Sequence, residues 1–467
     1  MQLRPYQDRI MDDIRSAYRS GQRSVLAVAP TGSGKTVLFS YAAKIASERG
    51  KRVGIIAHRI ELLDQCSDTL NQWGVQHGFV APGRGVDPFA RVQVCSVQSL
   101  ARKIKNGIFR PYDFCIIDEA HHAVAGSSWG QVIDAHPEAK ILGVTATPAR
   151  LGGEPLSAFQ TMVVGPTVRE LIDLGALTPY SLFCPPAVDM TRVSRRGGDY
   201  ARDENETAMD KPTVTGDAVR EYLRRARGKR AVAFCVSIAH AQHVAAQFLA
   251  SGVASESIDG KMDRSARFAV LDRFRRGETL VLTSADLVSE GFDLPAIEAA
   301  ILLRPTQSLA LCLQQVGRAL RPFPGKDRAI ILDHAGNLGP NGRHGLPDDD
   351  REWTLEGRVK GQGVSGTPTI PMSQCAHCFF TGRPFVVCPS CGHERAIEGR
   401  KVEEVEGELQ EIDLEAARRA KRVEQARAAG LAELIALGKQ RGYKKPEAWA
   451  KFVWASRNQK FAANARG

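Results

Sequence analysis

The sequence predicts an α/β protein with two tandem parallel, doubly wound sheets, followed by a small zinc-binding module and a helical basic tail. Three observations support this fold class. Short apolar runs alternate with helical patterns up to residue 338, which is typical of parallel sheets covered by helices. A glycine-rich segment separates the first apolar run from the next helical pattern, and two Cys-x-x-Cys pairs stand together near residue 380.

The first lobe is predicted to span residues 1–178. Its apolar runs are bounded by turn residues and are short enough for buried parallel strands. The predicted strands of this lobe are 25–29, 53–57, 92–95, 114–117 and 141–144.

A phosphate-binding loop is predicted directly after the first strand. Its backbone amides and the N-terminus of the following helix can bind anionic phosphates. We expect Lys35 to reach the outer phosphates and the Thr36 hydroxyl to hold Mg²⁺. Ala29 stands where the strict pattern has Gly. The predicted nucleotide contacts in this loop are Thr31, Gly32, Ser33, Gly34, Lys35 and Thr36.

Two consecutive acids, Asp118 and Glu119, follow the apolar run 112–117. A buried parallel strand would deliver them to the carboxyl edge of the sheet, beside the phosphate loop. We expect Asp118 to orient Mg²⁺ through its water shell and Glu119 to polarise the attacking water. Solvated acids at a strand end are the alternative, and the upstream loop favours the catalytic interpretation.

The second lobe is predicted to span residues 179–338, with a polar connector or insertion at about 185–210. Its predicted strands are 231–236, 279–283, 299–303 and 329–333. No second phosphate loop follows any of these runs. We therefore expect this lobe to donate residues to a nucleotide held by the first lobe, with ATP at the interface between the lobes.

Arg318 and Arg321 lie three residues apart on one face of a predicted helix, with Gln314 one turn earlier. Arginines so placed can stabilise the charge that develops on a transferred phosphoryl group. A solvated basic helix face is the alternative. The position of the pair, after a second set of strand and helix patterns, favours the catalytic interpretation.

These segments, in this order, resemble those of superfamily 2 DEAD/DEAH-box helicases, most closely the RadD-like branch of bacteria and phages. The resemblance covers residues 3–321 and implies two RecA-like P-loop NTPase lobes that use ATP and Mg²⁺. Ala29 is a common departure in this family.

The resemblance also implies roles for further residues. Gln7, in the segment 3–7, would read adenine with Arg4 or Tyr6 packed nearby, and Gly291 and Asp293 would contact the nucleotide from the second lobe. The residues implied to contact nucleic acid are His58, Arg59, Ser96, Gln98, Thr145, Thr147 and Thr283.

Composition agrees with a nucleic-acid partner. The chain of 467 residues carries a formal charge of +11, which suits a polyanion. The N-terminus does not resemble a signal peptide, and no apolar stretch approaches the roughly 20 residues that span a membrane. We therefore expect a soluble, cytoplasmic protein whose ten cysteines are thiols or metal ligands.

Residues 339–371 are rich in Gly, Pro and Asp and are predicted to be a linker beyond the motor. Residues 372–395 follow as a zinc knuckle whose four thiolates suit tetrahedral Zn²⁺. The predicted ligands are Cys375, Cys378, Cys388 and Cys391. Free thiols are the alternative, and His377 and His393 are expected to face solvent. Zinc should be structural, and its loss should spare the two lobes.

Residues 396–467 are predicted to form a helical tail in which basic residues alternate with aromatics such as Trp449, Phe452, Trp454 and Phe461. This pattern fits phosphate contact and base stacking. It fits equally a small helical cap whose aromatics form its core.

The expected function is an ATP-dependent helicase or translocase, with DNA favoured over RNA, in repair, recombination or phage replication. The alternatives are a DNA-stimulated ATPase that remodels or loads a partner without unwinding, an RNA helicase, and the motor subunit of a restriction system. A replication or repair protein could bind the zinc module or the tail.

Overall fold

The computed structural model describes residues 2–85, 87–124, 126–148, 153–184, 193–196, 199–210, 212–285, 297–340, 342–357, 371–394, 423–425, 427–443 and 445–464. Contacts divide the chain into two compact units, Met1–Ile397 and Glu398–Gly467.

The first sheet has seven strands in the order β3-β4-β2-β5-β6-β1-β7, and every pairing in it is parallel. Its strands are β1 (Ser24–Val28), β2 (Val53–Ala57), β3 (His77–Val80), β4 (Val92–Ser96), β5 (Phe114–Asp118), β6 (Lys140–Thr145) and β7 (Thr161–Val164). The five predicted strands are present, and the short edge strands β3 and β7 are additional.

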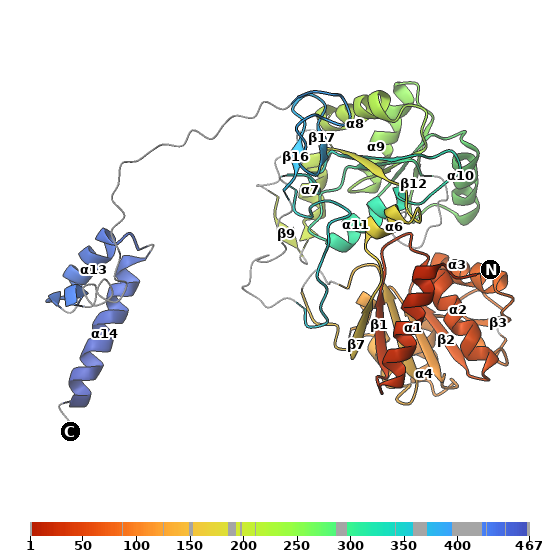
Figure 1. The fold of residues 1–467 in the computed structure, drawn as a ribbon, viewed down its shortest axis with the longest axis horizontal. Helices are drawn as coiled ribbons and strands as arrows, with labels where there is room; N and C mark the ends of the chain where they lie inside the picture. The colour runs from red at the N-terminus through yellow and green to blue at the C-terminus, as the bar shows by residue number, and fades with distance from the viewer. Residues whose placement is uncertain are drawn as a thin grey trace. The chain divides into compact units, whose positions relative to one another are not determined.

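Helices cover both faces of this sheet (Figure 1). Successive strand residues point to opposite faces, so Val25 and Ala27 enter one hydrophobic cluster and Leu26 and Val28 the other. The first cluster includes α1 (Pro5–Arg19), α2 (Lys35–Glu48) and α3 (Ile60–Gln72). The second includes α4 (Val97–Lys105), α5 (Ser128–Asp134) and the short 3₁₀ helix η1 (Ala120–His122).

The second sheet has eight strands in the order β12-β13-β11-β14-β15-β8-β17-β16. It is parallel from β12 to β8 and antiparallel at β17 and β16. Its strands are β8 (Tyr180–Phe183), β11 (Ala231–Phe234), β12 (Ser255–Ile258), β13 (Val281–Ser284), β14 (Ala299–Leu302), β15 (Ala329–Asp333), β16 (Ser373–Gln374) and β17 (Phe380–Gly382). Helix α6 (Val168–Asp173) lies in the connector between the two sheets. The helices that follow in the second half are α7 (Arg202–Met209), α8 (Pro212–Arg225), α9 (Ile238–Ala250), α10 (Arg264–Arg276) and α11 (Leu309–Ala319).

The described part of the predicted polar insertion packs onto the second half of the molecule. A short hairpin of β9 (Arg195–Arg196) and β10 (Asp199–Tyr200) precedes α7. The amide of Asn205 donates to the carbonyl of Pro305, and Met209 is buried. Charged residues here surround a few buried contacts, so composition alone did not reveal the packing.

The four-cysteine hairpin joins the second sheet, because β17 pairs antiparallel with β8. Arg225 donates to the carbonyl of Cys378 at 2.6 Å, and three of the four cysteines belong to the large hydrophobic cluster. The cluster follows the two sheets in the chain, as predicted. The structure corrects the expectation that this module is separate from the lobes.

Residues 342–357, which we name the strap, belonged to the predicted linker. Leu346 and Asp348 are buried, and the carbonyl of Leu355 accepts a hydrogen bond from the amide of Leu156 in the first half of the molecule. The structure therefore corrects the linker prediction for these residues. Turn-rich composition does not exclude packing, because Arg351 satisfies four backbone carbonyls of the strap.

The second unit contains α13 (Leu431–Gln440) and α14 (Pro446–Asn464). Leu434, Ala450 and Val453 form its small core, and Trp449 and Trp454 pack against that core. Phe452 is 73% exposed. The contacts favour the helical-cap interpretation for the two tryptophans, while the basic residues 418–422 lie outside the described residues. None of the described helices combines the length and apolar character needed to cross a bilayer.

Candidate phosphate-binding site and metal centre

The loop between β1 and α2 has the backbone of an anion-binding loop. Gly32 and Gly34 have φ of 88° and 80°, in the left-handed region that favours glycine. The Lys35 ammonium donates to the carbonyls of Ala29 at 3.2 Å and Pro30 at 3.3 Å. Burial lowers the pKa of Lys35, whereas the negative charges of the Glu119 and Asp118 carboxylates act to raise it. Lys35 is thus held inside the loop, beside the acid pair.

Asp118 ends β5 at the carboxyl edge of the first sheet and is 4% exposed. Burial and the neighbouring Glu119 raise the pKa of Asp118 to about 7, while the Lys35 ammonium opposes the shift. Glu119 has a φ of 47°, an uncommon conformation for a residue with a side chain. The bend turns the chain sharply after the strand, so both carboxyl groups lie near the phosphate loop.

His121 connects this acid pair to the segment Thr145–Pro148. Its Nδ1 atom lies 3.3 Å from Glu119 Oε2 and 3.0 Å from Thr145 Oγ1. Thr145 Oγ1 in turn accepts from the backbone amide of Thr147 at 3.2 Å. His121 was not among the predicted site residues, although its place two residues after Glu119 was the available signal.

Helix α11 and the residues directly after it bring the predicted arginines to the phosphate loop of the first sheet. Arg318 is in the last turn of α11, but Arg321 lies beyond the helix end, which corrects the prediction that both arginines share one helix face. Arg318 is 7% exposed, and the charges of Arg321 and Arg318 both act on Lys35. A Cβ atom on Gly32 would lie 3.6 Å from Arg321 Cγ. Gln314 is buried on the same helix. The two arginines, Lys35 and the acid pair, distant in sequence, therefore converge.

The N-terminal segment fastens α1 to the phosphate loop. Gln7 Nε2 donates to the carbonyls of Ser33 at 3.1 Å and Gly34 at 3.3 Å, and Gln7 Oε1 accepts from the amide of Arg4. The Tyr6 hydroxyl donates to the carbonyl of Ser33. These contacts place Gln7 at the loop, and adenine recognition stays a prediction.

The residues predicted to contact nucleic acid fall into two groups. His58 and Arg59 are partly buried and Gln98 is exposed, while Ser96 is 7% exposed and its hydroxyl donates to Gln98 Oε1 at 2.8 Å. Thr145, Thr147 and Thr283 are at most 1% exposed, and the Thr283 hydroxyl donates to the carbonyl of Ala241. These three threonines therefore face the interior. Gly291 and Asp293 lie outside the described residues.

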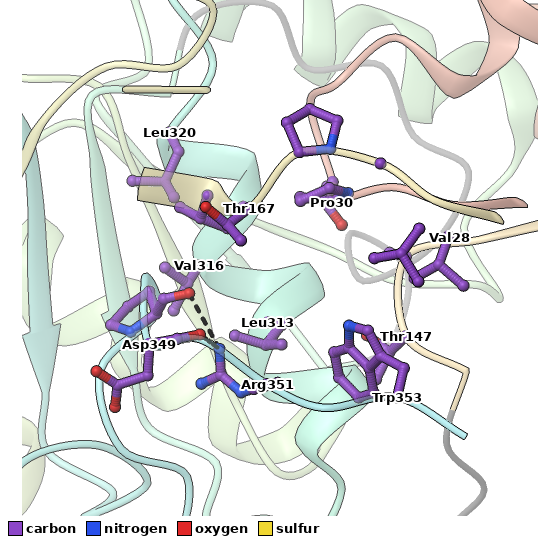
Figure 2. Close-up of a pocket in the computed structure, with 18 residues that line it drawn as sticks. Val28, Pro30, Thr147, Thr167, Leu313, Val316, Leu320, Asp349, Arg351 and Trp353 are labelled. Carbon is purple, nitrogen blue, oxygen red and sulfur yellow. Dashed lines mark hydrogen bonds between the residues drawn. The ribbon is translucent and has the colours of Figure 1, made fainter. Parts of the chain in front are cut away.

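A cavity of about 80 Å³ lies between the two sheets, next to the phosphate loop. Arg351 and Trp353 of the strap line one side of it, and Pro30 and Thr167 lie across from them (Figure 2). Val316, Gly317 and Leu320 of α11 also line it. The strap, the connector after β7 and the helix with the arginines thus meet at one interface, which sequence reasoning missed.

Asp348 of the strap is a buried carboxylate shared by several parts of the fold. It pairs with Arg169 on α6 and accepts from the hydroxyl of Tyr180 on β8. Arg383, in the cysteine hairpin, lies 3.7 Å away. Asp348 therefore links the strap to the connector between the sheets and to the cysteine hairpin.

The four cysteines form the candidate metal centre. The Sγ atoms of Cys375, Cys378, Cys388 and Cys391 all lie within 4.8 Å of one another. The Cys375–Cys391 and Cys378–Cys388 distances are 3.7 and 3.6 Å. Tetrahedral Zn²⁺ with Zn–S bonds of about 2.3 Å needs sulfurs about 3.8 Å apart. The donor set fits zinc, and the exposed His377 and His393 stack on each other outside it.

Comparison with known proteins gives two family matches. Residues 1–150 match the model described as "Type III restriction enzyme, res subunit", and residues 215–322 match "Helicase conserved C-terminal domain". The first match covers β1 to β6 of the first sheet, and the second covers β11 to β14 of the second sheet together with α11.

Two relatives align over most of their length. A 51.5 kDa protein of Lactococcus phage (isolate 7-9) is 32% identical, over 83% of this chain and 82% of its own. The DNA 3'-5' translocase XPB2 of Sulfurisphaera tokodaii is 25% identical, over 71% of this chain and 81% of its own. Two fungal helicase relatives are longer, and the chain spans 51% and 58% of their length.

Solved structures share the fold. The type ISP restriction-modification enzyme LlaBIII bound to DNA superposes with a TM-score of 0.52 at 19% identity, over 71% of this chain and 28% of its own. Saccharomyces cerevisiae Dbp5, bound to RNA and ADP BeF3, gives 0.50 at 15% identity, over 71% of this chain and 88% of its own.

Proposed function

The chain belongs to the superfamily 2 helicases, which are ATPases, and from this premise we propose that it is a translocase or helicase driven along DNA by ATP hydrolysis. The observation that carries the proposal is the meeting of α11 with the phosphate loop. Two arginines from one sheet approach the lysine and carboxylates of the other. Hydrolysis can therefore be coupled to movement between the two halves.

In the proposed mechanism, the halves are motor lobes at 1–178 and 179–338. Lys35 binds the outer phosphates, and Thr36 and Asp118 hold Mg²⁺, which neutralises phosphate charge when bound. Glu119 polarises the attacking water. Because His121 Nδ1 lies 3.3 Å from Glu119 Oε2 and also contacts Thr145 Oγ1, His121 connects this base to the Thr145–Pro148 segment. Arg318 and Arg321 stabilise charge on the transferred group, with Gln314 beside them.

The proposal extends to the nucleotide and nucleic-acid contacts. Gln7 and Arg4 would lie near the base, and His58, Arg59, Ser96 and Gln98 would contact the strand. DNA is favoured because the XPB2 relative is named as a DNA translocase and LlaBIII was solved with DNA. Placement in the RadD-like branch rests on the resemblance of the motifs. A role in repair, recombination or phage replication is part of the same proposal, and phage replication fits the phage origin of one relative. A replication or repair partner would bind through the cysteine hairpin or the tail.

The test is steady-state ATP hydrolysis by wild type and Glu119→Gln, with single-stranded, duplex and forked DNA and with single-stranded RNA. Each substrate is titrated with salt, because phosphate contacts weaken as counterions accumulate. We expect stimulation by DNA that salt reduces. Glu119→Gln should keep ATP binding but hydrolyse it about 100-fold more slowly or worse.

The outcomes separate the alternatives. Stimulation by RNA alone would reassign the substrate, and stimulation without strand separation or translocation would indicate a remodelling ATPase. Normal hydrolysis by Glu119→Gln would show that Glu119 is not the base. A Glu138→Gln variant, at a carboxylate outside the proposed site, is the matched control and should hydrolyse ATP like wild type.

A further inference from the structure

Lys326, between α11 and β15, is a lysine that is only 8% exposed. Its ammonium donates to the carbonyls of Ile297 at 2.8 Å and Arg321 at 2.8 Å, and also to the carbonyl of Ala319. An ammonium group has three donors, so three backbone acceptors use all of them.

Two of these acceptors belong to the end of α11. The helix ends at Ala319, and the last carbonyls of a helix have no partner within it. The carbonyl of Leu320 is bound as well, by the backbone amide of Thr178 at 2.8 Å. A buried cation and the connector between the lobes therefore hold the end of α11, where the helix dipole favours positive charge.

The same helix end carries the two arginines of the proposed site. Arg318 is in its last turn, and Arg321 follows two residues after Ala319. Gly317 already packs against Thr31, so α11 has little room to move toward the phosphate loop. A shift or fraying of this end would carry both guanidinium groups away from Lys35.

We propose that Lys326 is a positioning residue for ATP hydrolysis, which fixes the end of α11 so that Arg318 and Arg321 reach the transferred phosphoryl group. The inference rests on the proposed function of these arginines. Burying a charged ammonium group costs free energy. Accordingly, burial lowers the pKa of Lys326 to about 8, although the negative charge of Glu298 acts to raise it. A methionine side chain has a similar length but no hydrogen-bond donor, so it cannot bind these three carbonyls.

The test compares Lys326→Met and Lys326→Arg with wild type in kcat, ATP affinity and thermal stability. The matched control is Lys229→Met, which removes a nearby lysine that pairs with Glu298 and is 39% exposed. We expect Lys326→Met to lower kcat by about tenfold or more, with ATP affinity within about twofold of wild type. Lys326→Arg should recover part of the rate, since it restores donors, and the control should keep the wild-type rate.

A double-mutant cycle with Arg318→Ala separates positioning from general damage. If Lys326 acts through the arginines, Lys326→Met should lower kcat by a smaller factor in the Arg318→Ala background than in wild type, and by less than about twofold once Arg321→Ala is added, because no arginine then remains to be positioned. An equal loss in both backgrounds, or an unchanged kcat in Lys326→Met alone, would overturn the inference. Wild-type hydrolysis by both Arg318→Ala and Arg321→Ala would instead overturn the proposed arginine function.

Should Lys326→Met unfold below the assay temperature, Lys326→Arg decides the question in the same cycle. A kcat loss in Lys326→Arg that shrinks in the Arg318→Ala background and disappears once Arg321→Ala is added supports positioning. A loss that persists there, or no loss at all, contradicts a positioning role that depends on ammonium geometry.

Discussion

A methyl group placed on Gly317 would lie 2.6 Å from the Cβ atom of Thr31, so α11 of the second lobe touches the phosphate loop of the first without room for a side chain. The same interface holds Arg318 and Arg321 near Lys35. The spacing of the two lobes is therefore set, at this point, by the absence of a side chain at residue 317.

We expect Gly317→Ala to lower kcat by roughly tenfold, because overpacking of about 1–3 kcal/mol would hold the lobes apart. Steady-state hydrolysis at saturating ATP measures this effect. Gly260→Ala is the control, since a methyl group there would meet no atom within 4 Å. Wild-type kcat in Gly317→Ala would show that this contact does not limit closure.

The buried Asp118 predicts a pH dependence of stability for the protein free of metal and nucleotide. Because its pKa is raised to about 7, Asp118 contributes stability at low pH that is lost as pH rises through about 7. Asp118→Asn lacks this dependence. The difference between the melting temperature of the variant and that of wild type should therefore shift in favour of the variant as pH rises from 5 to 8. Melting curves in EDTA across this range test the prediction, and a constant difference would contradict it.

Zinc loss should affect the motor, because β17 of the cysteine hairpin extends the second sheet through β8. We expect Cys391→Ser to lose zinc and to lower the melting temperature of the first unit, Met1–Ile397, by about 5 °C or more. Metal analysis and melting curves measure both effects. His393→Ala, which changes an exposed neighbour of the cluster, should retain zinc and stability. Zinc loss without a change in melting temperature would show an independent module.

Asp348→Asn should destabilise the protein by about 1–3 kcal/mol, because it leaves Arg169 without its buried carboxylate partner. The loss is smaller than for a fully buried pair, since the Arg169 side chain is 46% exposed. Urea denaturation gives the free energy of unfolding. Asp350→Asn, at an exposed neighbouring residue, is the control. If Asp348→Asn and Asp350→Asn had the same free energy of unfolding, the proposed role of Asp348 in linking the strap to its neighbours would be contradicted.

Much of the fold could be predicted because its signals are local. The central strands of both sheets are apolar runs such as Val25–Val28 and Ala231–Phe234, buried on both faces. The edge strands β3, β7 and β12 were not predicted, because a strand with one exposed side needs fewer apolar residues. The strap was predicted as a linker because its Gly, Pro and Asp content indicates turns but does not show whether those turns pack.

The sequence by itself determined the two sheets, the phosphate loop with its acid pair, and the four-cysteine cluster, since each depends on residues close together in the chain. Only the tertiary structure decided which distant groups meet. It brought Arg318 close enough for its charge to act on Lys35, gave Lys326 the carbonyls at the end of α11, and joined the cysteine hairpin to β8. Such contacts depend on how lobes and helix ends pack in space, and no local spacing in the chain encodes that packing.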